Sequence, residues 1–345
     1  MHPTIPTSNT TTFAVLSTGT WGITLAGVLA QNGYRVRAWD IDRDLIEVLC
    51  RERRHPKLEH YRIPDPVDLS HDLNEVLEEA AVGVLVPPSS AMRSLCQSIK
   101  AAARTDEFEA FVICSKGIET RTLKLMHEVL TDELGAAAAS RTGILSGPSH
   151  AEEVARCMPT SMVASAPDLG LAEHIQQWFF RPYLRIYTHD DMTGVELGAS
   201  VKNVIAIAAG ICDGMGFGDN ARAALMTRGL AEIVRLGVAA GARHETFMGL
   251  SGMGDLIVTA GSRHSRNRRF GELLATGSSV AEALKTIGMV VEGYDSTLSV
   301  TKLARQLGVA MPISGAVYEI LYEGKDLQQA IRDLMARDPK PEHYT

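Results

Sequence analysis

The sequence contains few cysteines, and none of them forms a recognisable motif. No CxxC spacing occurs, and the five cysteines are scattered along the chain as Cys50, Cys96, Cys114, Cys157 and Cys212. Neither a zinc site nor a disulfide framework is therefore indicated, and we expect no metal site. Free thiols fit a reducing compartment, so we expect a cytoplasmic protein.

An excess of positive charge and a membrane-spanning run are also missing. The 345 residues include 34 Lys and Arg against 41 Asp and Glu, which gives a formal net charge of −7. No broad positive field is available to hold a nucleic acid or an acidic membrane. No apolar run approaches the roughly 20 residues of a membrane span, so we expect no membrane insertion. The start lacks the features of a secretory signal, and residues 1–12 are predicted to be a disordered lead-in.

The length favours two domains, and the two halves of the chain differ in pattern. Up to about residue 190, short apolar runs alternate with helical segments, which predicts an α/β domain of the Rossmann type around a parallel sheet. Beyond that point no strand pattern appears, and helical segments follow one another. We therefore expect an α/β domain over residues 1–190 and an all-α domain over residues 191–345, with a loose tail from Arg337.

A glycine-rich loop follows the first predicted strand, residues 13–17. Gly19 and Gly22 lead into a helical segment, and a second strand ends at Asp40, about 20 residues after the loop. This order is typical of a dinucleotide-binding fold, and the alternative is a Rossmann-like domain without a cofactor. Ser17 stands where the first glycine is usual, so it is either strained or held at a negative φ.

Small and polar residues follow four of the predicted strands. Ligands of open parallel sheets collect at the carboxyl ends of the strands, so these segments predict a common site. They are Ser17–Gly22, Pro87–Ser89, Ser115–Gly117 and Ser146–Ser149. Lys116 lies in one of them, and it is either a surface lysine or part of the site.

The stretch Gly194–Ala209 reads as a helix whose positions are nearly all apolar or small. A helix that is apolar all round is a buried helix. Lys202 and Asn203 lie in its middle. The lysine either extends its ammonium to the surface or faces a cleft, where it must find a partner or lose its charge.

Two further clusters lie in the second half. Asp255 follows the glycines of Ser251-Gly-Met-Gly, where it either belongs to a site or caps a turn. The stretch Ser265-Arg-Asn-Arg-Arg-Phe270 suits a phosphate, with a solvated basic face as the alternative. A dinucleotide, an anion-binding arginine and a lysine of lowered pKa are together equipped for hydride transfer to a small phosphorylated ketone.

The whole series of motifs resembles the NAD(P)-dependent glycerol-3-phosphate dehydrogenase family. Nearly the full chain carries the resemblance, in the family's order, through the stretches Gly19–Gly22, Ser115–Gly117, Leu145–Ser149, Glu196–Ala206, Asp213–Asn220, Thr227–Glu232, Ser251–Leu256, Ser265–Arg269 and Val290–Gly293. The resemblance implies reversible reduction of dihydroxyacetone phosphate to sn-glycerol 3-phosphate, which feeds phospholipid synthesis, and a homodimer. Residues 1–190 would then form the dinucleotide-binding domain, and residues 191–345 would form the substrate-binding and catalytic domain.

The matching positions imply three sets of site residues. The catalytic residues would be Lys202, Lys116 and Asp255. The cofactor would contact Gly19, Thr20, Trp21, Gly22, Asp40, Lys116, Ala151, Arg266, Val290 and Glu292. The substrate would contact Lys116, Gly147, Ser149, Lys202, Asn203, Asp255, Ser265, Arg266 and Asn267.

Asp40 predicts a preference for NAD(H) over NADP(H). A carboxylate at the end of the second strand accepts hydrogen bonds from ribose hydroxyls and repels a 2′-phosphate. Arg37 or Arg43 would make NADP(H) acceptable if either reached that phosphate. Two other functions remain open: a related two-domain dehydrogenase acting on another phosphorylated or hydroxy-acid substrate, and a catalytically inactive NAD-binding sensor.

Overall fold

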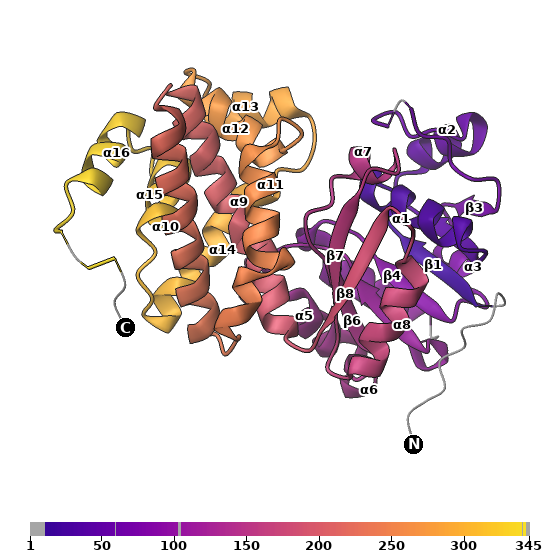
Figure 1. Ribbon diagram of the computed structural model, residues 1–345. Coiled ribbons are helices and arrows are strands. Elements are labelled where there is room, and N and C mark those ends of the chain that lie inside the picture. The colour runs from indigo at the N-terminus through magenta and orange to yellow at the C-terminus, as the bar shows by residue number, and fades with distance from the viewer. Residues whose placement is uncertain (1–10, 59, 103–104, 340, 343–345) are drawn as a thin grey trace.

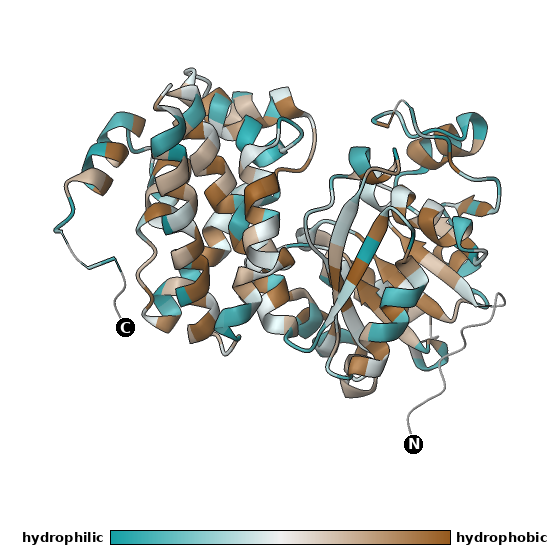
Figure 2. Ribbon diagram, in the orientation of Figure 1, coloured by the Kyte–Doolittle hydropathy of each residue, from teal (hydrophilic) through white to brown (hydrophobic). Residues whose placement is uncertain are grey.

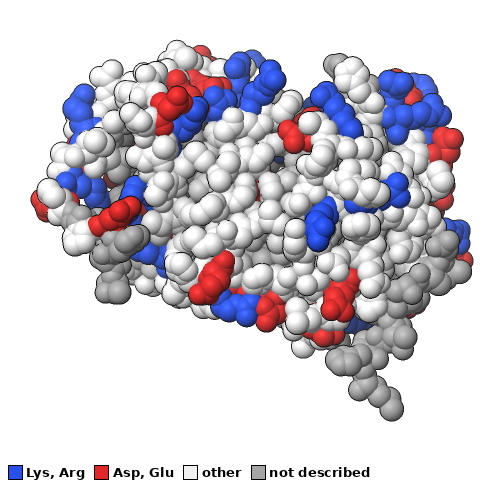
Figure 3. All heavy atoms as spheres, in the orientation of Figure 1, with Lys and Arg blue, Asp and Glu red and all other residues white. Residues whose placement is uncertain are grey.

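The computed structural model describes residues 11–58, 60–102, 105–339 and 341–342. These residues form an α/β domain and a helical domain that lie side by side (Figure 1). The predicted fold class is confirmed. On the face shown in Figure 3, basic and acidic side chains are interspersed, and no patch of one sign covers a domain.

A single sheet of eight strands organises the first domain, in the order β3-β2-β1-β4-β5-β6-β7-β8. The strands are β1 (Thr12–Leu16), β2 (Arg35–Trp39), β3 (Val67–Ser70), β4 (Val82–Leu85), β5 (Ala110–Ile113), β6 (Thr142–Ser146), β7 (Thr160–Ser165) and β8 (Leu184–His189). The sheet is parallel, as expected of a Rossmann-type domain, except that β7 runs antiparallel to β6. The connection between them holds only the four-residue helix α7 (Ala151–Val154), which does not carry the chain back for a parallel crossover.

The sheet is buried on both faces, as helix-covered parallel strands require. Along β1, Phe13 and Val15 enter one apolar cluster, and Ala14 and Leu16 enter the cluster on the opposite face. In Figure 2 the apolar colour runs along these central strands. The covering helices are α1 (Thr20–Gln31), α2 (Arg43–Glu52), α3 (Leu73–Leu77), α4 (Met92–Ala101), α5 (Met126–Leu134), α6 (Ala136–Ala139) and α8 (Leu169–Phe179).

Helix α9 (Met192–Gly214) is the centre of the second domain and extends beyond the expected bounds at both ends. The helices around it are α10 (Gly218–Ala239), α11 (Asp255–Gly261), α12 (Arg266–Ala275), α13 (Val280–Ile287), α14 (Glu292–Leu307), α15 (Pro312–Tyr322) and α16 (Leu327–Met335). By length and composition α9 could cross a membrane, but 94% of its most apolar window is buried inside the protein. Its apolar character is that of a core helix packed against α10, α11, α12 and α14.

Two glycines allow α9 and α12 to cross at close range. A Cβ on Gly210 of α9 would lie 1.9 Å from the carbonyl oxygen of Arg268. A Cβ on Gly271 of α12 would lie 2.1 Å from the carbonyl oxygen of Ile207. Backbone therefore packs against backbone at this crossing, which fixes the start of α12 relative to the middle of α9.

The expected boundaries need one correction. Residues 1–10 of the predicted lead-in lie outside the described residues, but Thr11 and Thr12 are buried and Thr12 begins β1. The lead-in therefore does not reach residue 12, because the first strand pairs with β2 from that residue on. At the other boundary β8 ends at His189 and α9 begins at Met192, and we propose the domain division at 190/191.

Candidate active site

Lys202 lies in the middle of α9 and does not reach the surface. Its side chain is 6% exposed, and its Nζ donates to Asp255 Oδ1 at 2.5 Å and to Thr259 Oγ1 at 2.6 Å. Both acceptors belong to α11. The alternative of a lysine that extends to solvent is therefore wrong, because α11 covers this face of α9 and supplies the polar partners.

The local sequence explains why α11 approaches Lys202. The turn Leu250–Gly254 precedes α11, and Gly252 packs so closely that a Cβ would lie 2.2 Å from the carbonyl oxygen of Phe247. A Cβ on Gly198 of α9 would lie 2.7 Å from the carbonyl oxygen of Ser251. Because Gly198 lies one helical turn before Lys202 on the same face, this contact brings Asp255 opposite the lysine.

The first domain adds a second lysine to the same carboxylate. Lys116 follows β5, and its Nζ donates to Asp255 Oδ2 at 2.8 Å and to the carbonyl oxygen of Gly147 at 3.1 Å. Ser149 also donates to that carbonyl, at 3.1 Å. Two strand ends of the α/β domain therefore meet α9 and α11 of the helical domain at Asp255.

Burial and charge shift the pKa values of this cluster in opposite directions. Burial lowers the pKa of Lys202 well below its usual range, and the like charge of Lys116 adds to that shift, while Asp255 opposes it. Burial alone would raise the pKa of Asp255, but Lys116 and Lys202 outweigh it and hold the carboxyl below its ordinary pKa. Two ammonium groups face one carboxylate, so the cluster favours an oxyanion or another negative charge beside it.

A chain of amide groups connects α9 to the start of α12. Asn267 donates to Asn203 Oδ1 at 2.9 Å, and its own Oδ1 accepts the backbone N–H of Gly293 at 2.9 Å. Ser265 caps α12 by accepting the N–H of Arg268 at 3.2 Å. Both asparagines and Ser265 are buried, so this region is a fixed part of the wall between α9, α12 and α14.

Two of the three arginines in the stretch Ser265–Phe270 have different surroundings. Arg268 forms an ion pair with Asp213 at 2.7 Å and with Glu272 at 2.8 Å, which commits it to the helix packing. Arg266 is exposed and donates to the carbonyl oxygen of Val290 at 2.7 Å. Of these two, Arg266 is the one whose guanidinium lies at the surface and can turn toward a ligand.

The glycine loop has open space where a cofactor needs it. Gly19 is the N-cap of α1, no side chain caps this helix, and a Cβ built on Gly19 would meet nothing within 4 Å. Gly22 differs, since a Cβ there would lie 1.9 Å from the carbonyl oxygen of Ser17. Gly22 therefore serves the packing of strand on helix, whereas Gly19 leaves room in front of the free N–H groups of α1, as a bound pyrophosphate requires.

Ser17 has a φ of 91°, so of the two alternatives the strained one holds. Asp40 ties this loop down, because its Oδ2 accepts the N–H of Thr18 at 2.7 Å and its Oδ1 accepts the N–H of Asp42 at 3.1 Å. Asp40 is only 8% exposed. Asp40 thus has a structural role in the loop in addition to the expected one toward a ribose.

The remaining expected cofactor residues lie at or next to the starts of α1, α7 and α14. Glu292, the first residue of α14, accepts the hydroxyl of Ser89 at 2.8 Å, which joins the helical domain to the end of β4. Burial raises the pKa of Glu292. Ala151 is the first residue of α7, Val290 is exposed beside α14, and Thr20 and Trp21 form the first turn of α1.

Thr259 was missed in the sequence, although it lies next to the expected lysine. Its signal is the spacing Asp255-x-x-x-Thr259, which places both side chains on one face of a helix. Among the described residues, no group of three or more His, Cys, Asp or Glu side chains is placed to hold a metal ion.

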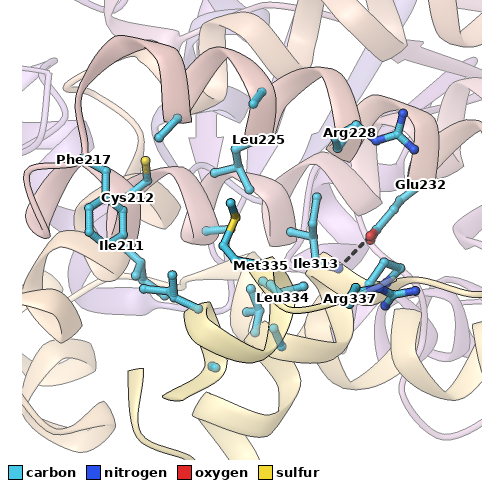
Figure 4. A pocket seen from close by; sticks show the side chains of 18 of the residues that line it. Ile211, Cys212, Phe217, Leu225, Arg228, Glu232, Ile313, Leu334, Met335 and Arg337 are labelled. Carbon is cyan, nitrogen blue, oxygen red and sulfur yellow. Dashed lines mark hydrogen bonds between the residues drawn. The ribbon is translucent and has the colours of Figure 1, made fainter. Parts of the chain in front are cut away.

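A separate apolar cavity of about 540 Å³ lies between α9, α10, α15 and α16 (Figure 4). None of the expected site residues lines it. Its most buried charge, Glu232, accepts the backbone N–H of Ile313 at 2.6 Å and of Ser314 at 3.1 Å, so this carboxylate caps α15. The cavity is therefore distinct from the lysine cluster.

Comparison with known proteins gives one consistent result. The model of the NAD-dependent glycerol-3-phosphate dehydrogenase N-terminus matches residues 12–172, and that of the C-terminus matches residues 191–332. Proteins named glycerol-3-phosphate dehydrogenase [NAD(P)+] are 46% identical in Geobacillus kaustophilus, over 95% of both chains, and 46% identical in Chlorobium limicola, over 96% of this chain and 99% of the relative.

A solved structure agrees with these matches. The crystal structure of glycerol-3-phosphate dehydrogenase from Coxiella burnetii superimposes with a TM-score of 0.89 at 36% identity, over 96% of this chain and 100% of that one. Family models therefore cover both domains, and the relatives match over nearly their full length. The chain belongs to the NAD-dependent glycerol-3-phosphate dehydrogenase family.

Proposed function

We propose that this protein catalyses the reversible NAD(P)H-dependent reduction of dihydroxyacetone phosphate to sn-glycerol 3-phosphate, a precursor of glycerophospholipids. The observation that carries the proposal is the convergence of Lys202 and Lys116, from two domains, on the buried carboxylate of Asp255. A nicotinamide cofactor supplies the hydride when it is bound, and the side chains described above supply the charge and the proton.

In this mechanism Lys202 holds the proton. Its ammonium lies beside the substrate carbonyl, stabilises the alkoxide that forms there, and donates a proton to that oxygen. Asp255 and Thr259 fix the position of Lys202 Nζ, and Lys116 adds a second positive charge on the side of the first domain. The lowered pKa of Lys202 suits proton transfer near neutral pH.

The phosphate is assigned to the start of α12. Ser265, Arg266 and Asn267 provide a hydroxyl, a guanidinium and an amide around a helix N-terminus, all of which favour an anion. Binding at this point orients the carbonyl toward Lys202, because the energy of phosphate binding is spent on positioning. Gly147, Ser149 and Asn203 complete the proposed substrate contacts.

The proposed cofactor contacts lie along the edge of the sheet and the facing helices. The open space at Gly19 and the uncapped start of α1 fit a pyrophosphate. The contacts assigned to the cofactor are Gly19, Thr20, Trp21, Gly22, Asp40, Lys116, Ala151, Arg266, Val290 and Glu292.

We propose that NAD(H) is preferred over NADP(H). Asp40 places a carboxylate at the end of β2, where it would repel a 2′-phosphate by roughly 1–4 kcal/mol per unit charge at ~4 Å. Arg37 is turned away from that position, because its guanidinium donates to the carbonyl oxygens of Glu75 and Glu78. Arg43 is paired with Glu47 on the outer face of α2. Neither arginine is therefore held ready for the phosphate.

A single set of assays tests these proposals. Oxidation of NADH is followed with dihydroxyacetone phosphate, with NADPH and with the Lys202→Ala variant in parallel. Rapid oxidation that the variant loses is expected, with a kcat/KM for NADH at least about tenfold above that for NADPH, as ~1.4 kcal/mol of repulsion gives. A higher kcat/KM for NADPH would contradict the preference.

The same assays separate the two alternative functions. Turnover of another phosphorylated or carboxylated ketone, but not of dihydroxyacetone phosphate, would identify a related dehydrogenase. NADH binding without turnover of any ketone in the panel would identify a sensor, although a sensor has no need of both Lys116 and Lys202.

We also propose a cytoplasmic homodimer without membrane insertion and without a nucleic-acid partner. The burial of α9 within the helical domain supports the absence of membrane insertion, and the five free cysteines support a reducing compartment. The net charge of −7 argues against a nucleic-acid partner, and the homodimer is what the family resemblance implies. Light scattering after size-exclusion chromatography tests the dimer, and a monomer mass at assay concentration would contradict it.

A further inference from the structure

His150 lies close to both parts of the proposed substrate site but is not among the residues assigned to it. It directly precedes α7 and follows the loop that carries Gly147 and Ser149. Its ring centroid lies 6.0 Å from that of His264, which precedes the cap of α12, Ser265. The imidazole therefore lies beside the loop of Gly147 and Ser149 and close to the residue that precedes the helix start assigned to the phosphate.

The His150 side chain has an unsatisfied nitrogen. Within the part of the chain that the structure describes, Nε2 is shielded from solvent and has no hydrogen-bond partner. The side chain also makes no capping bond to α7, although it occupies the N-cap position. A buried polar atom without a partner is unfavourable, so its placement calls for a partner that arrives from outside the chain.

Burial and the nearby lysines favour the neutral form of His150. Burial lowers the pKa of the imidazole, the ammonium groups of Lys202 and Lys116 lower it further, and Glu152 and Glu153 of α7 oppose the shift. Beyond these groups it faces the ring of His264. A dianion placed beside the ring would reverse the balance and raise the pKa, because it favours the charged imidazolium.

We propose that His150 is a substrate-binding residue whose Nε2 hydrogen-bonds the phosphate of the bound substrate and takes up a proton as it does so. This inference rests on the proposed function, which supplies the phosphate dianion. Substrate affinity should therefore fall as the pH rises, because the hydrogen bond from the imidazolium forms only when His150 takes up a proton.

The test measures proton uptake and binding together. The enzyme is saturated with NADH and titrated with sn-glycerol 3-phosphate. Both ligands are in the reduced form, so no reaction occurs. Binding is measured by calorimetry near pH 7.5 in two buffers of different ionisation enthalpy. Net proton uptake is expected in the wild type. The His150→Gln variant should lose most of that uptake and bind about tenfold more weakly, as for one charge-assisted hydrogen bond. His264→Gln, which removes the neighbouring exposed ring, is the matched control and should behave like the wild type.

Either of two results would overturn the proposal. One is that His150→Gln shows the same proton uptake and substrate affinity as the wild type. The other is that His264→Gln, and not His150→Gln, loses the proton uptake. If His150→Gln does not fold, as judged by NADH affinity and circular dichroism, His150→Asn replaces it. Nitrogen NMR of histidine-labelled wild type is independent of any variant: absence of a ring that protonates when sn-glycerol 3-phosphate is added would also overturn the proposal.

The proposed function is judged separately. The proposed function itself would be contradicted if the wild-type enzyme neither bound sn-glycerol 3-phosphate nor oxidised NADH with dihydroxyacetone phosphate. If the wild type turns over dihydroxyacetone phosphate and His150→Gln binds sn-glycerol 3-phosphate as tightly as the wild type, only the role assigned to His150 is contradicted. Titration with inorganic phosphate in place of the substrate should show the same dependence on His150, because the contact is to the phosphate.

Discussion

Lys116 Nζ and Asp255 Oδ2 lie 2.8 Å apart across the boundary between the sheet domain and the helical domain. The same carboxylate receives Lys202 from α9. Asp255 therefore holds one lysine from each domain, and the charge arrangement exists only while the domains are together. A second tie across the boundary, from Ser89 to Glu292, supports the same approach at the end of β4.

Replacing Lys202 should abolish the reaction without preventing cofactor binding. Lys202→Met removes the proton donor, so kcat for ketone reduction should fall about 10²–10⁴-fold. NADH affinity, measured by fluorescence titration, should stay within about twofold because α1 and its loop are untouched. Lys302→Met, on an exposed position of α14, is the control and should retain full activity. Unchanged kcat in Lys202→Met would exclude the lysine as the donor.

Replacing Lys116 and replacing Asp255 should move the pH profile of kcat for ketone reduction in opposite directions. Reduction needs protonated Lys202, so its rate falls as the pH rises through the pKa of this lysine. Lys116→Met removes a like charge and should raise that pKa, which moves the alkaline limb of kcat to higher pH. Asp255→Asn removes an opposite charge and should move the limb to lower pH. Both variants will lose activity, so only the pH at which the alkaline limb falls is compared. Shifts in the same direction would contradict the assignment of this limb to Lys202.

The two glycines of the cofactor loop should respond differently to the same substitution. Gly19→Ala puts a methyl group into open space, so the melting temperature should hold while NADH affinity falls about tenfold or more. Gly22→Ala forces a Cβ against the carbonyl oxygen of Ser17, so stability itself should fall by several kcal/mol. Thermal melts with and without NADH distinguish the two effects. Equal loss of stability in both variants would argue against a reserved space at Gly19.

Relieving the strain at Ser17 should stabilise the protein. Ser17→Gly accepts the φ of 91° without steric conflict, so the free energy of unfolding should rise by about 1 kcal/mol. Ser17→Ala keeps the strain and removes only the hydroxyl, which lies 3.3 Å from Asp40 Oδ2, and should not gain stability. Denaturant unfolding of both variants checks this. A gain in Ser17→Ala equal to that in Ser17→Gly would assign the effect to the hydroxyl instead.

Much of this architecture could be predicted because its signals are local. The apolar run of β1, the glycine loop and the buried stretch around Lys202 each carry their pattern within about a dozen residues. Strand β3 was not recognised, since it is four residues long and only Val67 in it is buried. The reversal of β7 was not predictable either, because strand direction depends on how the chain returns after α7 and not on the composition of the strand.

The partners in the site were harder to predict than its lysines. A lysine in an apolar helix is visible in the local pattern, but that pattern does not say which carboxylate faces it, since Asp255 is 53 residues further on. The resemblance alone assigned Asp255 to the same site. His150 stands among small polar loop residues and has no pattern of its own. Its orphaned nitrogen becomes evident only when the packing around it is known.

The crossing of α9 and α12 has a consequence for how the family can diverge. Gly210 and Gly271 each face backbone, so neither position can drift to a larger residue while the helices keep their distance. Substitutions that alter substrate choice must then leave this glycine pair in place. The two helices would therefore keep one fixed crossing, and a saturation library selected for new substrates should retain glycine at both positions.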